Sequence, residues 1–302
     1  MVAARNTAEN IRAPFRSNFI EVAGTEEREL AKQILKLNEH RRSNTEKTNG
    51  NPVVWKILKS GVVSWIILFV VWIVASKLND PDFLPSPAAT LEGFTEIVKS
   101  GVLWQDIKVS MIRVFFGWTR GLLFAIPVGL LIGQFKPVRA VIEPLISFFR
   151  FVPAIGFLTL FLMWFGVGEG SKLALITYAV VFPVIVNTIA GVSGIDPVKY
   201  QAAESLGATR VRTFFTVTVP GAVPGILTGV RLGLSGAIIS IVAAEMLAAN
   251  EGLGYLIYTS RLYYRTDWIF VGIFILGIIG FVADKLIRYI AYRLFRFYGV
   301  TR

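Results

Sequence analysis

Residues 173–195 read LALITYAVVFPVIVNTIAGVSGI and carry no charged side chain over 23 consecutive positions. A helix of about 20 mainly apolar residues crosses the roughly 30 Å hydrocarbon core of a membrane. In lipid, only helices and closed barrels satisfy their backbone hydrogen bonds, and this run is too long and continuous for a barrel strand. The stretch therefore predicts a membrane-spanning helix.

Apolar runs of similar length recur along the whole chain, which has 302 residues and is 54% hydrophobic. A soluble all-helical protein would need buried helices with almost no polar face, which argues against that class. We expect an all-α integral membrane protein with a membrane domain over residues 60–302. With their flanks, the runs predict six transmembrane helices, near 60–78, 107–133, 144–166, 171–194, 222–247 and 267–289.

Basic residues gather on one predicted side of the membrane. The net charge is +11, with 11 Lys and Arg in the first 60 residues and five between Lys285 and Arg302. The connections near 134–143 and 196–212 add further basic residues. Because cytoplasmic segments carry an excess of Lys and Arg, both termini are predicted to be cytoplasmic in a multi-pass inner (plasma) membrane protein. This distribution favours contact with membrane lipid and argues against nucleic acid.

Two short helices are predicted outside the membrane before the second span. Residues 1–59 form a cytoplasmic N-terminal tail, in which apolar residues recur at helical spacing near 25–42. We expect an amphipathic helix there, which either lies on the membrane surface or contacts a partner subunit. On the other side, Ser86-Pro87 suits a helix start, and an apolar stripe follows as far as Gly101. That stripe consists of Leu91, Phe94, Ile97 and Val98.

Polar residues inside the predicted spans are costly and therefore informative. Arg113 and Arg120 are seven positions apart, hence on one helix face. Each either helps an anion across or forms a structural pair, and Glu245 is the nearest acidic residue by depth for Arg113. Asn187 either bridges two helices or lines a path. These four residues are the candidates for a translocation path.

Interruptions of the spans bear on the kind of transport. Pro127, Pro153 and Pro183 fall inside predicted spans and would each kink or break a helix. We find neither an internal repeat nor broken half-helices in matching positions, and this argues against a secondary transporter.

The sequence has few of the residues and motifs that enzymes use for catalysis. There is no cysteine, and the single histidine, His40, lies in the tail. No GxxxxGK[ST] phosphate-binding loop occurs, so any ATP hydrolysis is expected on another polypeptide. We therefore expect no enzyme activity and no metal or other cofactor in this chain.

A polar segment follows the opening stretch: residues 195–220 read IDPVKYQAAESLGATRVRTFFTVTVP. Asp196 suits a helix N-cap, so a helix is expected near 197–206. Gly207 suits the left-handed residue that ends such a helix, and Thr209 can cap a second short one. Ala202 and Ala203 leave one face nearly without side chains, which suits the close approach of a partner.

The same segment resembles the cytoplasmic loop of binding-protein-dependent ABC importer permeases. That loop reads Glu-Ala-Ala, three residues, Gly, nine residues, Ile, one residue, Leu-Pro. Here Gln201 replaces the glutamate, valines replace the isoleucine and the leucine, and every spacing is kept as far as Pro220. The stretches FLPSP, SMIRVFFGW, AIPVGLLIG, GILTGVRLGL, VAAEML and EGLGYLI look like the nitrate/sulfonate/taurine/bicarbonate branch.

The resemblance implies a type I ABC importer permease fold, with a permease domain over 60–302 and a coupling helix near 197–206. It also implies a homodimer of permeases, ATP-binding-cassette ATPase subunits that bind ATP and Mg²⁺, and an external solute-binding protein. Arg120 stands where this branch is expected to have an apolar or small residue, so its role is not carried over. The residues that would couple to the ATPase are Gln201, Ala202, Ala203, Glu204, Gly207 and Pro220.

Substrate identity stays open at this point. An organosulfonate such as taurine or an alkanesulfonate is expected, with nitrate, bicarbonate or another small organic solute as alternatives. A stand-alone channel or ion-driven carrier is the alternative from another class, and flux without an ATPase would identify it.

Overall fold

The computed structural model describes residues 61–298 together with Gln33 and Lys36. Apart from those two residues, which are helical and exposed, the predicted tail and its helix near 25–42 lie outside the described residues. The chain divides into two compact units, Met1–Trp72 and Ile73–Arg302. Helix α4 (Val62–Leu78) runs across this division; it is apolar, and none of its 17 residues, all of them described, is buried.

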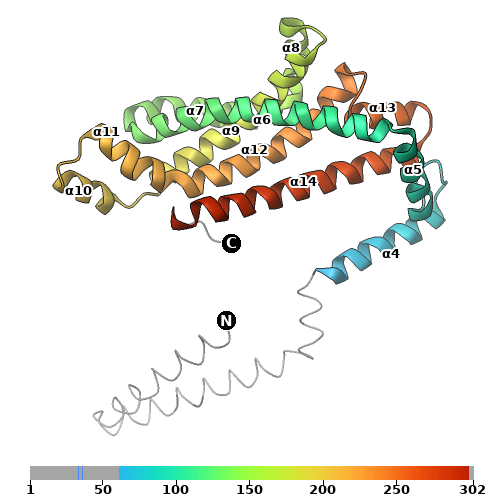
Figure 1. Cartoon of the computed structure of the whole chain (residues 1–302), viewed down its shortest axis with the longest axis horizontal. Coiled ribbons are helices and arrows are strands. Elements are labelled where there is room, and N and C mark those ends of the chain that lie inside the picture. Colours follow the sequence, from blue (N-terminus) through green and yellow to red (C-terminus); the bar gives the residue numbers. More distant parts are fainter. Residues whose placement is uncertain (1–32, 34–35, 37–60, 299–302) are drawn as a thin grey trace. The chain divides into compact units, whose positions relative to one another are not determined.

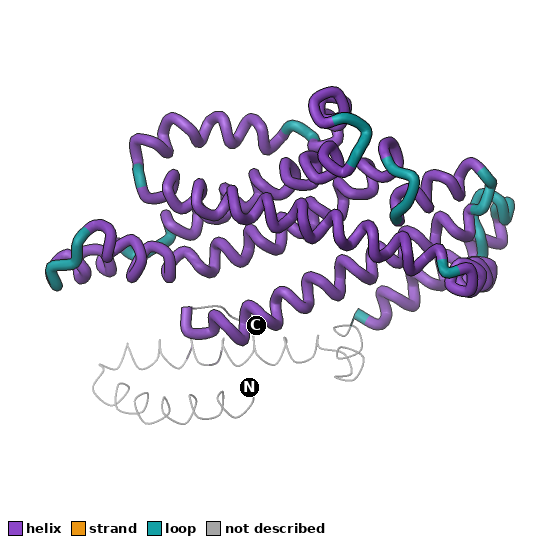
Figure 2. The backbone as a smooth tube through the Cα atoms, turned by 45° about the horizontal axis from the view of Figure 1, so that its top comes forward, coloured by secondary structure: helices purple, strands orange, loops and turns teal. Residues whose placement is uncertain are grey.

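The second unit is built from helices, and none of its described residues belongs to a strand (Figures 1 and 2). Three long helices at its centre, α6, α9 and α12, run side by side, and α14 follows the same direction (Figure 1). In chain order the elements are α5 (Pro87–Ser100), α6 (Val102–Gln134), α7 (Lys136–Phe151), the 3₁₀ turn η1 (Ala154–Phe157), α8 (Leu158–Phe165), α9 (Glu169–Ser193), α10 (Pro197–Ser205), α11 (Arg210–Thr213), the π-helix η2 (Phe214–Thr218), α12 (Val219–Ala248), α13 (Leu253–Leu262), α14 (Thr266–Phe295) and η3 (Arg296–Tyr298).

Four helical stretches among the described residues are long and apolar enough to cross a membrane. They are Val102–Gln134, Glu169–Ser193, Arg210–Ala248 and Thr266–Phe295. The pair formed by α7 with η1 and α8 makes a fifth if it is counted as one span, and α4 is a shorter apolar helix of 17 residues. The structure thus contains four to five clear spans where the sequence predicts six.

The predicted span near 144–166 is not one continuous helix. It divides into α7 and the η1–α8 pair, with a bend of 90° between them. The bend falls at Pro153, and a proline disfavours the helical conformation of the residue before it. Val152 is accordingly extended, with ψ of 119°. Pro127 and Pro183 were expected to kink or break their spans, but each lies inside a continuous helix.

The core forms where α9 packs between α6 and α12. Its apolar centre includes Ile176, Val180 and Val184 of α9 and Ile241 of α12, all of them fully buried. Small residues let the helices approach closely, as is common in membrane bundles. A Cβ atom added to Gly225 of α12 would lie 2.5 Å from the Cα atom of Gly191 in α9. The α9–α12 contact therefore tolerates no side chain at Gly225.

Helix α5 confirms the predicted start and end of the short helix before α6. The Ser86 side chain accepts a hydrogen bond from the Ala89 N–H, and Gly101 ends the helix with φ of 78°. Its buried face was predicted only in part: Ile97 is fully buried, but Leu91 is 63% exposed. The small Gly93 turns toward Asp267 at the start of α14 instead, so α5 packs through a narrower face than its apolar stripe suggests.

Candidate functional site

The polar segment between α9 and α12 forms the two short helices that its caps predict. The Asp196 carboxylate accepts a hydrogen bond from the Val198 N–H at 2.9 Å, and α10 begins at Pro197. Gly207 follows α10 with φ of +71°, a conformation that glycine adopts without strain. The Thr209 hydroxyl then accepts from the Arg212 N–H at 3.3 Å and caps α11.

Helix α10 is little buried by the rest of its own chain. None of its nine residues, which the structure describes in full, is buried, and α10 packs against α11 and η2. Leu206, directly after it, is 86% exposed. Four predicted coupling residues are exposed, Ala203 is half-buried, and Pro220 is half-buried in the first turn of α12; the exposed four are Gln201, Ala202, Glu204 and Gly207. This surface is available to a partner.

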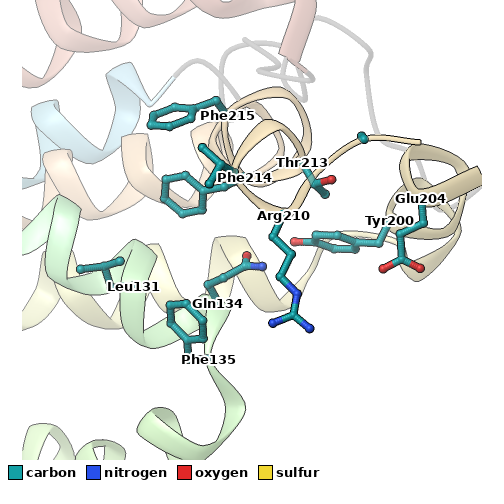
Figure 3. Close-up of a pocket in the computed structure, with 11 residues that line it drawn as sticks. Leu131, Gln134, Phe135, Tyr200, Glu204, Arg210, Thr213, Phe214 and Phe215 are labelled. Atoms are coloured by element: carbon teal, nitrogen blue, oxygen red, sulfur yellow. The ribbon is translucent and has the colours of Figure 1, made fainter. Parts of the chain in front are cut away.

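A cavity of about 520 Å³ lies between α10–α11 and the end of α6 (Figure 3). Aromatic rings form much of its wall, and Arg210 and Glu204 bring opposite charges to it. Tyr200 extends from α10 toward Gln134, the last residue of α6. The lining residues are Leu131, Gln134, Phe135, Tyr200, Glu204, Ala208, Arg210, Val211, Thr213, Phe214 and Phe215. The cavity leaves space between α10 and the bundle.

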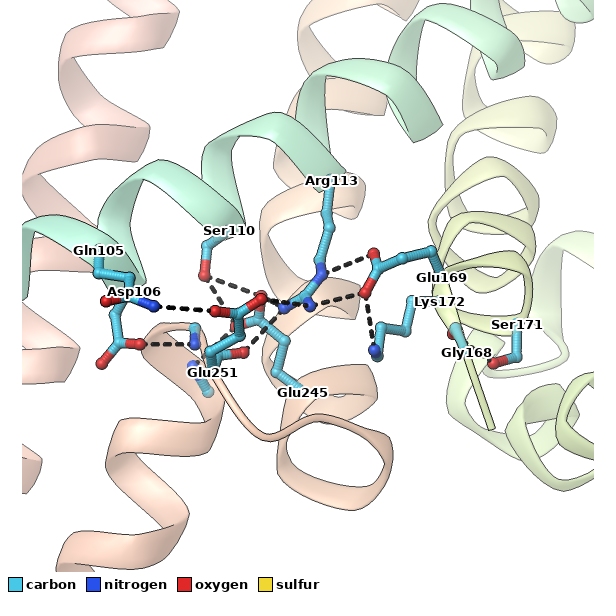
Figure 4. A network of polar contacts seen from close by, with 12 residues as sticks. Gln105, Asp106, Ser110, Arg113, Gly168, Glu169, Ser171, Lys172, Glu245 and Glu251 are labelled. Atoms are coloured by element: carbon cyan, nitrogen blue, oxygen red, sulfur yellow. Dashed lines mark hydrogen bonds and ion pairs between the residues drawn. The ribbon is translucent and has the colours of Figure 1, made fainter. Parts of the chain in front are cut away.

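A buried polar network occupies the other end of the bundle, around Arg113 of α6 (Figure 4). The Arg113 guanidinium donates to both carboxylate oxygens of Glu169, at 2.8 and 2.7 Å. It also donates to Glu245 of α12 at 2.9 Å, which confirms the predicted pairing. Arg113 is only 4% exposed and Glu245 is fully buried. A buried charge pair of this kind needs hydrogen bonds to all its polar atoms.

The same network holds the loop between α12 and α13. The Arg113 guanidinium donates to the backbone carbonyl of Glu251 at 2.8 Å. The N–H groups of three successive residues, 252–254, donate to Asp106, Ser110 and Glu245 at 2.7, 2.9 and 2.9 Å, respectively. Helix α6 therefore fixes the backbone of this loop through side chains spaced by four and three residues.

The other two candidates for the translocation path lie apart from this network. Arg120 is exposed, and the ion pairs of the described residues do not include it. The spacing of seven positions does not give the two arginines the same surroundings, because Arg113 is 4% exposed whereas Arg120 is exposed. Helix α9 contacts α6 at Gly117 and Gly121, on either side of Arg120, without covering it. Asn187 is half-buried and donates to the Pro183 carbonyl of its own helix at 2.8 Å, rather than to a second helix.

Several residues of the Arg113 network, and a second ion pair, are not predicted from the sequence. Asp106 and Ser110 precede Arg113 by seven and three positions, so their helical spacing was an available signal. Glu169 lies at the start of α9 and Glu251 in the loop between α12 and α13, and neither has such a spacing signal. Within α12, Arg231 donates to Asp284 of α14 at 2.8 Å, and this ion pair was likewise not predicted.

Comparison with known proteins identifies the family. The sequence matches the binding-protein-dependent transport system inner membrane component over residues 125–296. It is 38% identical over 240 residues to the taurine transport system permease protein TauC of Escherichia coli (strain K12), covering 78% of this chain and 87% of that relative. It is 30% identical over 238 residues to an aliphatic sulfonates transport permease protein, SsuC, of Bacillus subtilis (strain 168), covering 78% and 86%.

A solved structure shares the fold. A chain of the MetNI methionine ABC transporter, in inward-facing conformations, superposes with a TM-score of 0.57 and covers 68% of this chain and 98% of that one. At 19% identity, this likeness concerns the fold alone. The sequence relatives are permease subunits rather than enzymes, and the ATPase of such systems is a separate subunit. This chain therefore belongs to the family of binding-protein-dependent transport system inner membrane components, the multi-pass permease subunits of ABC importers.

Proposed function

We propose that this permease translocates an organosulfonate, such as taurine or an alkanesulfonate, in an ATP-driven importer, and that α10 is its coupling helix. The observation that carries the coupling assignment is the exposure of α10 at the position of the family motif. Two relatives named for taurine and aliphatic sulfonates support the substrate class. Nitrate, bicarbonate or another small organic solute are the alternative substrates of the same machinery.

The proposed assembly contains two copies of this chain, two ATPase subunits and a solute-binding protein. The ATPase subunits bind ATP and Mg²⁺ and dock on α10, at the cytoplasmic side where both termini lie. The solute-binding protein meets the opposite end of the bundle, near α5 and α13. Six spans follow if α4 and the broken α7–α8 pair each cross the membrane once.

Coupling in this proposal works by alternating access. ATP binding closes the ATPase dimer, α10 moves with it, and the bundle opens outward to accept substrate; hydrolysis resets it inward. Ala202 and Ala203 let the ATPase surface approach the α10 backbone, and Gly207 provides the turn after it. Gln201, in place of the motif glutamate, contacts the ATPase without a charge. Glu204 and Pro220 complete the coupling segment.

Arg120 is the proposed anion contact of the translocation path. It is exposed about halfway along α6, where a lone charge facing lipid would be costly. A guanidinium group can bind the oxygens of a sulfonate as it binds a carboxylate. Arg113 and Glu245 already bind each other and are assigned to the wall of the path, with Asn187 on the adjacent α9.

Gly207→Leu tests the coupling assignment in the importer assembled in proteoliposomes. We expect uptake to fall at least about tenfold while the chain still reaches the membrane, because a leucine disfavours the left-handed turn after α10. Gly101→Leu is the matched control: Gly101 has φ of +78°, and the described residues leave the same open space around it. Normal uptake and normal ATPase stimulation in Gly207→Leu would contradict the assignment.

Substrate identity is tested by uptake of labelled taurine in competition with alkanesulfonates, nitrate and bicarbonate. We expect sulfonates to compete and the inorganic anions to have no effect at equal concentration. Arg120→Gln should reduce uptake while leaving ATPase binding intact. Competition by nitrate or bicarbonate alone would assign the alternative substrates, and flux without ATPase subunits would indicate a channel or carrier.

A further inference from the structure

Three side chains join α10 to the inner ends of α6 and α12. The Tyr200 hydroxyl of α10 lies 3.2 Å from the hydroxyl oxygen of Thr218. The Thr218 hydroxyl donates to the side-chain oxygen of Gln134, the last residue of α6, at 2.9 Å. Because a hydroxyl has one hydrogen, which Thr218 gives to Gln134, the Tyr200 O–H must be the donor to Thr218. We call this arrangement the Tyr200–Thr218–Gln134 bridge.

The bridge is the side-chain hydrogen-bonded connection from α10 to the bundle among the residues that the structure describes. The other side-chain hydrogen bonds of α10 stay within its own turns, from Val198 to Asp196 and from Ser205 to Gln201. The cavity of about 520 Å³ separates the remainder of α10 from the end of α6 (Figure 3). A displacement of α10 therefore reaches α6 directly through Tyr200.

The central residue of the bridge sits at an unusual backbone feature. Thr218 is fully buried and ends the π-helix η2, where the Val219 N–H donates to the Phe214 carbonyl five residues earlier. Single π turns are rare and are found mostly at functional sites. This turn joins the short α11 to the long α12, so Thr218 lies where movement of the cytoplasmic segment enters a membrane span.

We propose that Tyr200, Thr218 and Gln134 are positioning residues of coupling: the bridge transmits the position of α10 to the inner ends of α6 and α12 together. This inference rests on the proposed function of α10. None of the three residues needs to touch the ATPase or the substrate. With the bridge, a displacement of α10 also moves the inner ends of α6 and α12. Without it, α10 moves into the adjoining cavity and the two spans do not follow.

The test uses the full importer, with permease, ATPase subunits and solute-binding protein, in proteoliposomes. Tyr200→Phe removes one hydroxyl from a half-buried side chain, and Thr218→Val removes the central one at equal volume. We expect both variants to retain basal ATP hydrolysis and to transport about three- to tenfold less substrate per ATP hydrolysed. The double variant should be no worse than the worse single variant, because both break the same connection.

Two further variants separate coupling from simple stability. Thr218→Ser keeps the hydroxyl and should restore the transport-to-hydrolysis ratio. Thr216→Val is the matched control, because Thr216 lies in the same π-helix and is exposed, and the side-chain hydrogen bond it makes among the described residues goes to the Arg212 carbonyl of the adjoining α11. Its ratio should equal that of the unmodified protein.

The outcomes distinguish this inference from the function on which it rests. If ATPase subunits do not copurify with the unmodified chain, the proposed coupling function fails. If they copurify and Tyr200→Phe and Thr218→Val keep the normal ratio, the bridge is overturned and the function stands. Loss of ATPase binding in Tyr200→Phe would also overturn it, because the bridge would then serve assembly rather than transmission.

Discussion

The two ends of the bundle differ in the burial and hydrogen bonding of their polar residues. Around Arg113, the arginine and Glu245 are buried while Glu169 is exposed, and every nitrogen of the guanidinium has a partner in the same chain. Around α10, polar groups are exposed, and Tyr200 alone, among the described residues, bonds from this helix to the bundle. The first end pairs its buried charges within one chain, whereas the second leaves the helix that we propose as the coupling helix without a buried residue.

A polar residue in this apolar chain can therefore serve either the stability of the subunit or contact with a partner. A buried charge must be compensated where it lies, so the Arg113 network reports on the stability of the subunit. An exposed helix with small side chains adds little to the stability of its own subunit and is free to contact a partner. Substitutions at the first end should therefore change folding, and those at the second should change coupling with little effect on folding.

The largest expected contrast compares the same substitution at the two ends. Glu245→Gln should destabilise the protein by about 3 kcal/mol, because it removes a charge from a buried pair. Glu204→Gln, on the exposed α10, should change stability by less than about 0.5 kcal/mol. Thermal unfolding of both variants in detergent measures the difference.

A double variant checks the cause of that loss. Adding Arg113→Met to Glu245→Gln removes both charges, and we expect part of the stability to return. If Glu245→Gln and Glu204→Gln unfold at the same temperature, Glu169 alone satisfies Arg113 and the two ends do not differ in the way described.

The next contrast uses two glycines with positive φ. At Gly252, φ is +116° and a Cβ atom would lie 2.4 Å from a Glu245 oxygen. Gly252→Ala should therefore cost about 2 kcal/mol through strain and displacement of the network. At Gly207, with φ of +71°, the described residues leave the Cβ position open, so Gly207→Ala should cost about 1 kcal/mol.

Activity should reverse this order, which makes the pair of glycines informative. Gly207→Ala should lower transport per ATP hydrolysed more than Gly252→Ala does, once both are measured on folded protein recovered in equal amount. An equal loss of uptake from the two variants would show that stability, rather than position along the coupling segment, controls transport.

The sequence was most reliable where one local rule decides the structure. Asp196 and Gly207 predicted the start and end of α10, and Thr209 predicted the start of α11, because caps act within a few residues. The Arg113–Glu245 pair was also predictable, since two opposite charges at one depth in lipid have few other partners.

Features that depend on packing were not predictable in the same way. Three prolines carry the same local signal, yet only Pro153 coincides with a break, while Pro127 lies within a continuous helix. Glu169, at the start of α9, and Glu251, in the loop between α12 and α13, join the Arg113 network only because the folded bundle brings these segments together. The π-helix before α12 has no sequence signal that we can name.

The smallest expected effect comes from an exposed ion pair at the same end as the Arg113 network. Arg265 donates hydrogen bonds to Asp267 and Glu96 and lies 4.2 Å from the Trp268 ring centre. The hydrogen bond from Arg265 holds the pKa of Glu96 below its ordinary value. Because exposed pairs contribute little, Glu96→Gln should lower the unfolding temperature at neutral pH by about 2 °C or less.

The pH dependence of this small effect separates charge from packing. A lowered pKa in the folded state means that the stabilisation is present above the ordinary pKa of Glu96 and is lost as the pH falls through its lowered value. The difference between Glu96→Gln and the unmodified protein should therefore vanish in acid, whereas Glu92→Gln, at an exposed position on the same helix, should leave the unfolding temperature at neutral pH unchanged. A Glu96→Gln difference that persists in acid would mean that contacts of the side chain, and not its charge, hold α5 against α14.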